Sequence, residues 1–144
     1  MTTLSKQKVE LSIPSRAEFV AVARLTAAAI ASRMNFAYDA IDDIKLAVGE
    51  ACNNAIEHAY PGAEGEIRLS FSLGEDGVVI EIQDAGSGFD LAAQTVEDGA
   101  EPPERGLDLL LMRSVMDKVE VVSQAACGTR VTMTKHLADV STEG

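Results

Sequence analysis

The stretch 84–88, Asp-Ala-Gly-Ser-Gly, joins a carboxylate to two glycines directly after an apolar alternation over 78–82. Successive strand residues point to opposite faces, so the alternation places Asp84 on the buried face of a strand. A buried carboxylate is costly unless it meets a hydrogen-bond donor. Gly86 and Gly88 let another molecule approach the backbone closely. An adenine base, whose exocyclic amine would donate to the acid, suits this arrangement, and a plain surface turn is the alternative.

A second pair of polar residues lies on a helix expected from about Tyr38 to Pro61-Gly62. Glu50 and Asn54 are four residues apart, which places them one turn apart on one helix face. That face is opposite the apolar stripe, so the pattern alone favours an ordinary solvated face. Under a covering loop, Asn54 would instead offer a neutral oxygen to Mg²⁺ on a triphosphate, and Glu50 would accept a proton from an attacking hydroxyl or water.

Two shorter signals follow along the chain. Arg105-Gly106-Leu107 opens a helix expected over about 106–116, where unpaired N–H groups and the helix dipole form an anion site. Simple helix entry after two prolines is an equal alternative. Gly128-Thr129 begins the last strand, where the threonine hydroxyl would help Asp84 to hold a base, and ordinary strand chemistry is the alternative.

The other reactive side chains show no metal or catalytic spacing. We expect Cys52 in the core and Met112 and Met116 in packing roles. His58 is assigned to the surface or flank of its helix and His136 to the end of the last strand. The two cysteines lack the paired spacing of a disulfide framework or a zinc site.

Composition limits the class of protein. The 144 residues are 47% apolar and carry a net charge of −11, which predicts one domain, 1–144, with an ordered core from about 8 to 138. The negative charge argues against direct nucleic-acid binding. The longest apolar run, 21–31, is interrupted by Arg24, which we expect to face solvent, and it falls short of a membrane span. We expect a cytoplasmic protein.

The remaining pattern predicts the fold. Ser15 followed by Glu18 is a capping-box pattern that predicts a first helix running to about Met34. The segment 90–104 is acidic, contains two prolines and is expected to be a mobile loop. Alternating apolar residues predict five strands, at about 9–13, 67–73, 78–83, 119–121 and 131–133. The order β-α-α-β-β-loop-α-β-β predicts an α+β protein: a two-layer sandwich in which three helices cover one face of a mixed, mostly antiparallel sheet.

In this order the segments resemble the motifs of the GHKL superfamily, the Bergerat ATP-binding fold of gyrase, heat-shock chaperone, histidine-kinase and mismatch-repair ATPases. The four motifs correspond here to 50–55, 84–89, 105–107 and 128–129. The segment 50–60 resembles the bacterial anti-sigma factor serine kinases that control general-stress and sporulation sigma factors. Its sequence is Glu-Ala-Cys-Asn-Asn-Ala-Ile-Glu-His-Ala-Tyr. The resemblance covers about 11–137.

The resemblance implies ATP and Mg²⁺ as cofactors. Asp84 would bind the adenine amine with Thr129 assisting, Asn54 would hold Mg²⁺, and Glu50 would act as general base on a partner serine. Further positions are implied in nucleotide binding: Gly86, Gly88, Arg105, Gly106 and Leu107.

The resemblance also implies partners: a small anti-sigma-factor antagonist as substrate, a sigma factor and a second copy in a homodimer, with no membrane and no direct nucleic acid. Arg24 matches a first-helix arginine used for partner contact. Asp108 stands where the family often has glycine. This departure leaves open a nucleotide-binding regulatory module without kinase activity, and a switch kinase within a larger stress-signalling complex is a further alternative.

Overall fold

The computed structural model describes residues 7–58, 65–84, 103–124 and 128–137, with backbone alone for 58, 103–108 and 123–124. The elements, in chain order, are β1 (Gln7–Pro14), the short 3-10 helix η1 (Ala17–Phe19), α1 (Val20–Arg33), α2 (Tyr38–His58), β2 (Glu66–Leu73), β3 (Gly77–Asp84), α4 (Pro103–Val115), β4 (Lys118–Gln124) and β5 (Gly128–His136). This order matches the one that the sequence predicts.

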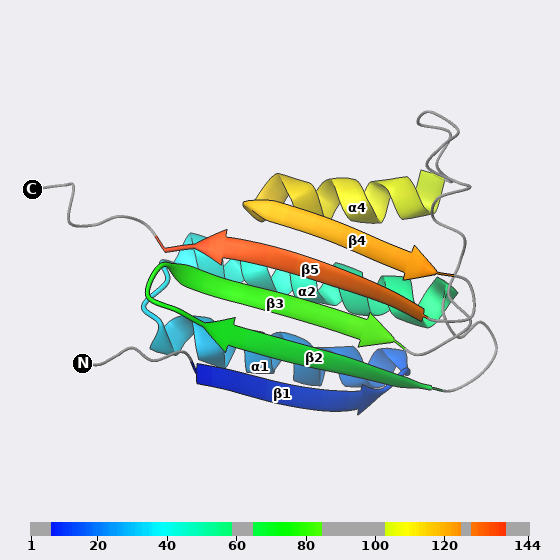
Figure 1. Ribbon diagram of the computed structural model, residues 1–144, viewed down its shortest axis with the longest axis horizontal. Coiled ribbons are helices and arrows are strands. Elements are labelled where there is room, and N and C mark those ends of the chain that lie inside the picture. Colours follow the sequence, from blue (N-terminus) through cyan, green and yellow to red (C-terminus); the bar gives the residue numbers. More distant parts are fainter. Residues whose placement is uncertain (1–6, 59–64, 85–102, 125–127, 138–144) are drawn as a thin grey trace, which may run out of the picture.

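The five strands form one sheet in the order β1-β2-β3-β5-β4, and all four pairings are antiparallel. The expectation of a mixed sheet is therefore wrong for the described strands. The helices α1 and α2 return the chain to the end where β1 finished, so β2 runs antiparallel to β1 (Figure 1). The single helix α4 makes β4 run in the same direction as β3, but β5 lies between them and pairs with both.

The helices lie together behind one face of the sheet, as predicted (Figure 1). α2 packs between α1 and α4. The core between the two layers is lined by every second residue of the central strands, and Val78, Ile80 and Ile82 of β3 are each at most 2% exposed. This alternation is what carries the next inward residue of β3, Asp84, into the helix-covered side.

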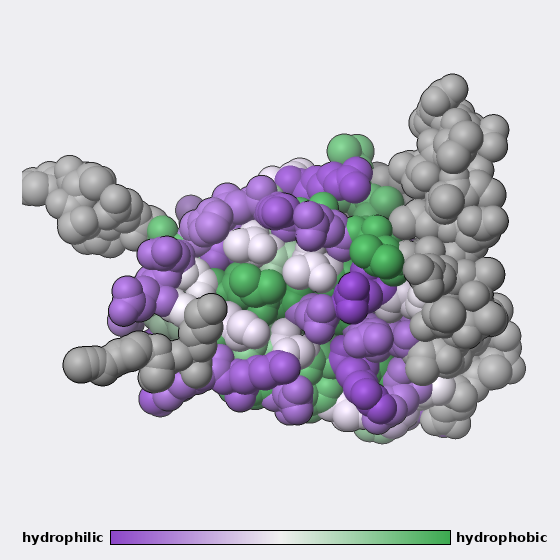
Figure 2. Space-filling model, viewed as in Figure 1, coloured by the Kyte–Doolittle hydropathy of each residue, from purple (hydrophilic) through white to green (hydrophobic). Residues whose placement is uncertain are grey.

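The opposite face of the sheet is not covered by helices, and hydrophilic residues surround a centre of intermediate and hydrophobic residues there (Figure 2). Its charges are paired along and across strands, in Lys8–Glu10, Arg68–Glu66, Lys118–Glu120 and Arg130–Glu81, at 3.4–3.5 Å. Exposed pairs of this kind contribute at most about 1 kcal/mol each.

The capping box predicted at Ser15 and Glu18 is wrong. The Ser15 hydroxyl accepts a hydrogen bond from the Gly65 N–H at 2.7 Å, and the Ser15 N–H donates to the Gly65 carbonyl at 2.9 Å. No side-chain hydrogen bond caps η1 at Arg16 or α1 at Phe19. Because Ser15 is buried against Gly65, its hydroxyl joins the end of β1 to the residue before β2 instead of capping a helix.

The third helix begins earlier than the sequence pattern predicts. α4 starts at Pro103, three residues before Gly106, and ends at Val115. Proline is favoured at the first helical position because it lacks an N–H that would be unpaired there. Gly106 therefore lies in the first turn of the helix instead of opening it.

Candidate functional site

The four segments that the sequence singles out belong to elements that converge. The C-terminal end of α2, the end of β3, the start of α4 and the start of β5 all lie at one end of the sheet, on the right in Figure 1. We call this the motif end of the molecule. The opposite end holds the β2–β3 turn and the C-terminus of α4.

Asp84 is the last residue of β3 and is 4% exposed, which confirms that its side chain is on the buried side. The main-chain N–H of Thr129, at the start of β5, donates to Asp84 Oδ1 at 3.3 Å. Thr129 is itself 4% exposed. A distance of 3.3 Å is longer than a typical N–H···O bond of about 2.9 Å, so this contact joins the ends of β3 and β5 only weakly. Base binding by these two residues stays a prediction.

Asn54 is also 4% exposed, and among the described residues its Oδ1 is the one buried side-chain oxygen or nitrogen without a hydrogen-bond partner. The solvated-face alternative is therefore wrong for Asn54. α2 is enclosed by the sheet and by both neighbouring helices, so Ala47 and Ala51 are buried along with the predicted stripe, and the buried arc extends to Asn54. Glu50, one turn earlier, is half-buried.

The donor set at Asn54 fits a hard cation. A buried acceptor without a partner costs about 1–3 kcal/mol, so such groups are retained where something outside the chain satisfies them. An amide oxygen is a regular ligand of Mg²⁺ or of the waters that Mg²⁺ retains. No group of three or more His, Cys, Asp or Glu able to hold a metal occurs in the described ranges.

The start of α4 supplies the third predicted part of the site. The first four N–H positions of a helix have no partner within the helix, and the positive end of its dipole lies there. Pro103, the first residue of α4, has no N–H, so the described part of this end offers the N–H groups of residues 104 and 105. Gly106 follows them in the first turn, and its role in nucleotide binding stays a prediction. The side-chain roles of Arg105 and Leu107 stay predictions. Gly86, Gly88 and the loop 90–102 lie outside the described residues.

The residues assigned to packing are confirmed. Cys52 and Met112 are 0% exposed and Met116 is 6% exposed. Burial raises the pKa of the Cys52 thiol to about 12, and the nearby Arg24 guanidinium acts in the opposite direction. The thiol is therefore protonated and unreactive at neutral pH. His58 and His136 are the last residues of α2 and β5.

Sequence reasoning missed two residues. The Lys135 ammonium, with its side chain 14% exposed, donates to the Val115 carbonyl at 2.5 Å and to Asp43 Oδ2 at 3.3 Å. The sequence does contain a sign of this role, because Lys135 occupies the next inward position after Val131 and Met133 in the alternation of β5. The other is Gly49, where α1 and α2 meet, and no sequence signal distinguishes it from an ordinary helical glycine.

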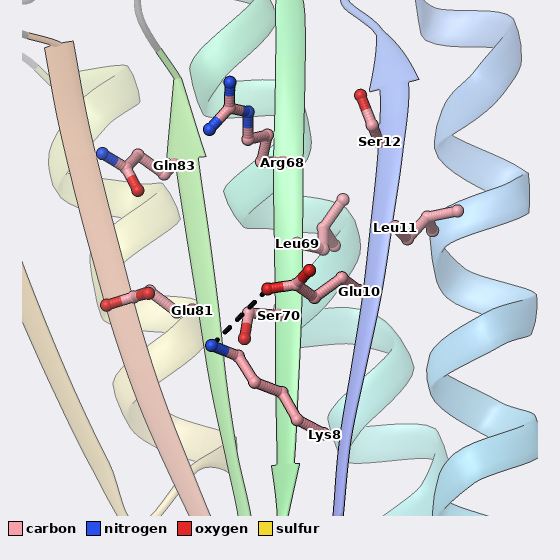
Figure 3. A pocket seen from close by; sticks show the side chains of 9 residues that line it. All are labelled: Lys8, Glu10, Leu11, Ser12, Arg68, Leu69, Ser70, Glu81 and Gln83. Atoms are coloured by element: carbon pink, nitrogen blue, oxygen red, sulfur yellow. Dashed lines mark ion pairs between the residues drawn. The ribbon is translucent and has the colours of Figure 1, made fainter.

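A hollow of about 490 Å³ lies on the helix-free face of the sheet, over β1, β2 and β3 (Figure 3). Glu81 and Gln83 line it, and they alternate with the inward Ile82 and Asp84. None of the residues that the sequence assigns to a site lines this hollow. It is therefore on the other side of the sheet from the buried carboxylate.

No helix in the described ranges is both long and apolar enough to span a bilayer. Arg24, expected to face solvent and to contact a partner, is exposed on α1. Its partner role stays a prediction.

Comparison with known proteins gives the family. The profile of the histidine kinase-like ATPase domain matches residues 13–135. The serine-protein kinase RsbW of Bacillus cereus strain G9842 is 41% identical over 139 residues, which cover 91% of this chain and 86% of the relative. The RsbW of Bacillus mycoides is 40% identical over the same shares.

Two solved structures share the fold. The RsbU and RsbW domains of a Mycobacterium tuberculosis protein align with a TM-score of 0.69 at 18% identity, over 91% of this chain and 32% of that one. The histidine kinase domain of an Erythrobacter litoralis blue-light activated kinase aligns with a TM-score of 0.57 at 19% identity, over 90% of this chain and 64% of that one. The resemblance to the GHKL ATPases is thus confirmed, and the chain belongs to the histidine kinase-like ATPase domain family and, within it, to the RsbW serine-protein kinases.

Proposed function

We propose that the protein is an ATP- and Mg²⁺-dependent serine kinase that phosphorylates a small anti-sigma-factor antagonist and also binds a sigma factor. The observation that carries this proposal is the buried, unpartnered Oδ1 of Asn54, one helical turn beyond Glu50 and at the same end of the molecule as Asp84. The family membership supplies the class of reaction.

Each residue has a distinct task in this proposal. Asp84 accepts a hydrogen bond from the exocyclic amine of adenine and so fixes the base under the end of β3. Asn54 holds Mg²⁺, which when bound neutralises phosphate charge and orients the γ-phosphoryl group. Glu50 accepts the proton of the substrate serine hydroxyl as the serine oxygen bonds to the γ-phosphorus, while the bond from that phosphorus to the β,γ-bridging oxygen breaks and ADP leaves with the electron pair. The N–H groups at the start of α4 hold phosphate oxygens.

Phosphoryl transfer needs mainly positioning and charge neutralisation from the protein. At the motif end, the candidate groups come from regular elements, α2, β3, β5 and the first turn of α4, which supports a role in positioning. Mg²⁺ and the N–H groups at the start of α4 would supply the charge neutralisation. Arg24, exposed on α1, would contact the partner protein, and a homodimer would be the assembled form.

The alternative is a nucleotide-binding module that regulates its partner without catalysis. The acidic Asp108, close to the helix start that would hold the phosphates, is the feature that favours it. A kinase assay separates the two functions.

The test mixes the protein with ATP, Mg²⁺ and the antagonist domain encoded by the same genome, and detects phosphoserine by mass spectrometry. We expect transfer by the natural chain and a loss of about 100-fold or more in Asn54→Ala, because the metal would lose its protein ligand. Asn53→Ala is the matched control, since Asn53 is the same residue type on the same helix and is half-buried. Transfer that survives in Asn54→Ala would remove the metal role, and absence of transfer to the antagonist would favour the regulatory module.

A further inference from the structure

The contact between α1 and α2 closes over Gly49, the residue directly before Glu50. A Cβ built on Gly49 would lie 3.1 Å from Cδ of Arg24 and 3.2 Å from its Nη1. Both distances are shorter than ordinary van der Waals contacts of about 3.5–4.0 Å. The arginine side chain therefore occupies the volume that any other residue at position 49 would fill.

The backbone does not explain this glycine. Gly49 lies inside the 21-residue helix α2, and its φ is not among the positive values that Gly77 and Gly128 adopt. Glycine is less favourable than alanine within a helix because it loses more backbone freedom on folding. The missing Cβ is thus the property that position 49 uses.

A second observation is that the charge of Arg24 also reaches Cys52, on the next turn of α2. The charge of Arg24 lowers the pKa of the Cys52 thiol, against the larger effect of burial, so the two groups are close. Cys52 is three residues beyond Gly49 and lies one turn along the helix. The arginine therefore reaches from α1 onto α2, with both Cδ and Nη1 beside Gly49, although the residue as a whole is exposed.

We propose that Gly49 is a positioning residue for Arg24: the absent side chain lets the arginine lie across α2 in one orientation, in which it is presented to the partner protein. The inference rests on the proposed function for the partner role of Arg24, and it adds the residue that prepares that contact. An arginine held in its binding orientation loses less rotamer freedom on association, so affinity rises without a new contact.

The direct test observes the arginine in the absence of any partner. In the natural chain we expect the Arg24 Nε–Hε group to give a resolved, ordered NMR signal, with a high heteronuclear NOE. In Gly49→Ala the methyl group displaces the side chain, and the signal should show fast averaging. Gly74→Ala is the matched control, because a Cβ there would meet only the Gly77 carbonyl, at 3.7 Å. Equal order of Arg24 in the natural chain and in Gly49→Ala would overturn the inference.

The second test measures affinity for the antagonist domain by calorimetry in a four-protein cycle: natural, Gly49→Ala, Arg24→Ala and the double variant. We expect Gly49→Ala to weaken binding about threefold to tenfold in the natural background and by less than about twofold when Arg24 is already alanine. A loss of equal size in both backgrounds would overturn the positioning role.

The NMR and affinity measurements separate the positioning role of Gly49 from the partner role of Arg24. If Arg24→Ala binds the antagonist and the sigma factor as tightly as the natural chain, the partner role of Arg24 fails, whatever the NMR signal shows. If Arg24→Ala weakens binding and Gly49→Ala does not, the partner role stands and the role of Gly49 fails. Gly49→Ala should remain folded, because the added methyl group meets only the flexible side chain of Arg24 and alanine favours the helix, and urea unfolding checks this.

Discussion

The two ends of the helix–sheet interface differ in whether the described chain supplies a partner for every buried polar side chain. At the motif end, the buried oxygen of Asn54 has no hydrogen-bond partner among the described residues, close to the contact between Thr129 and Asp84. At the other end, Lys135 donates both to the Val115 carbonyl and to Asp43. The Asn54 oxygen therefore depends on something outside the described residues for a partner, whereas the chain itself supplies the acceptors of Lys135.

The same difference separates the C-terminus of α4 from its N-terminus. Val115 is the last residue of that helix, where unpaired carbonyls and the negative end of the dipole attract a cation, and Lys135 supplies one. The first turn, at the other end of the helix, has N–H groups without partners in the helix, and the positive end of the dipole there attracts an anion. α4 is thus fixed at its C-terminus and open to a ligand at its N-terminus.

The largest expected effect is on nucleotide affinity. Asp84→Asn keeps the shape of the side chain but replaces an acceptor oxygen by a donor, so the adenine amine would lose its charged partner. We expect ATP affinity, measured by calorimetry with Mg²⁺, to fall about 10- to 100-fold. Asp76→Asn, in the exposed β2–β3 turn, is the control and should bind ATP normally. Normal affinity in Asp84→Asn would mean that the base lies elsewhere.

The next effect concerns stability at the satisfied end. Lys135→Met retains the aliphatic stem but leaves the Val115 carbonyl and Asp43 without their cation. Because the Asp43 side chain is 37% exposed and partly screened, we expect a loss of about 1–2 kcal/mol in the free energy of unfolding by urea. Lys118→Met, whose ion pair with Glu120 is exposed, should cost less than about 1 kcal/mol. An equal cost for the two variants would contradict the contrast between the ends.

A pH effect comes from the core between the two ends. The pKa of Cys52 is about 12 in the folded protein and about 9 when exposed. Between these values the unfolded chain binds fewer protons at this site, so stability falls as pH rises above about 9. By pH 10 the loss from this thiol should reach about 1.4 kcal/mol. Urea unfolding from pH 8 to 10.5 should show a flatter decline in Cys52→Ala, and parallel curves would disprove the shift.

The smallest expected effect is on the unliganded motif end. Asn54→Ala removes a buried acceptor that has no partner to lose, so the cost of the smaller side chain is offset by the relief of the unsatisfied oxygen. Without ATP, we expect its free energy of unfolding to change by less than about 1 kcal/mol. A loss larger than that of Lys135→Met would show that Asn54 is mainly structural.

Local patterns predicted most of the fold because the strands obey a strict alternation. The inward position of Asp84 followed from the three apolar residues before it, and their burial confirms the pattern. The errors arose where a partner distant in sequence decides the outcome. Ser15 has a capping pattern, but its hydroxyl binds Gly65, fifty residues away. The sheet looked mixed because nothing local shows that β5 enters between β3 and β4.

The site was predictable in its residue types and only partly in its environment. A helical wheel drawn for a one-sided surface helix places Asn54 with solvated residues, whereas α2 is enclosed on three sides and buries it. The contact between Arg24 and Gly49 depends on how two helices cross, which neither helix encodes alone. Lys135 was visible as a charge in an apolar alternation, but its two acceptors come from α2 and α4.

In the proposed function, one bound nucleotide spans the motif end, with its adenine at Asp84 and its phosphate-bound Mg²⁺ at Asn54. The most direct measurement replaces Mg²⁺ by paramagnetic Mn²⁺ together with a non-hydrolysable ATP analogue and follows NMR line broadening. We predict that the NMR signal of the Asn54 side-chain amide broadens most strongly. NOEs should connect the adenine protons to residues around Asp84 and Thr129. Broadening centred instead on Ser70 and Glu81, at the hollow on the helix-free face, would contradict it.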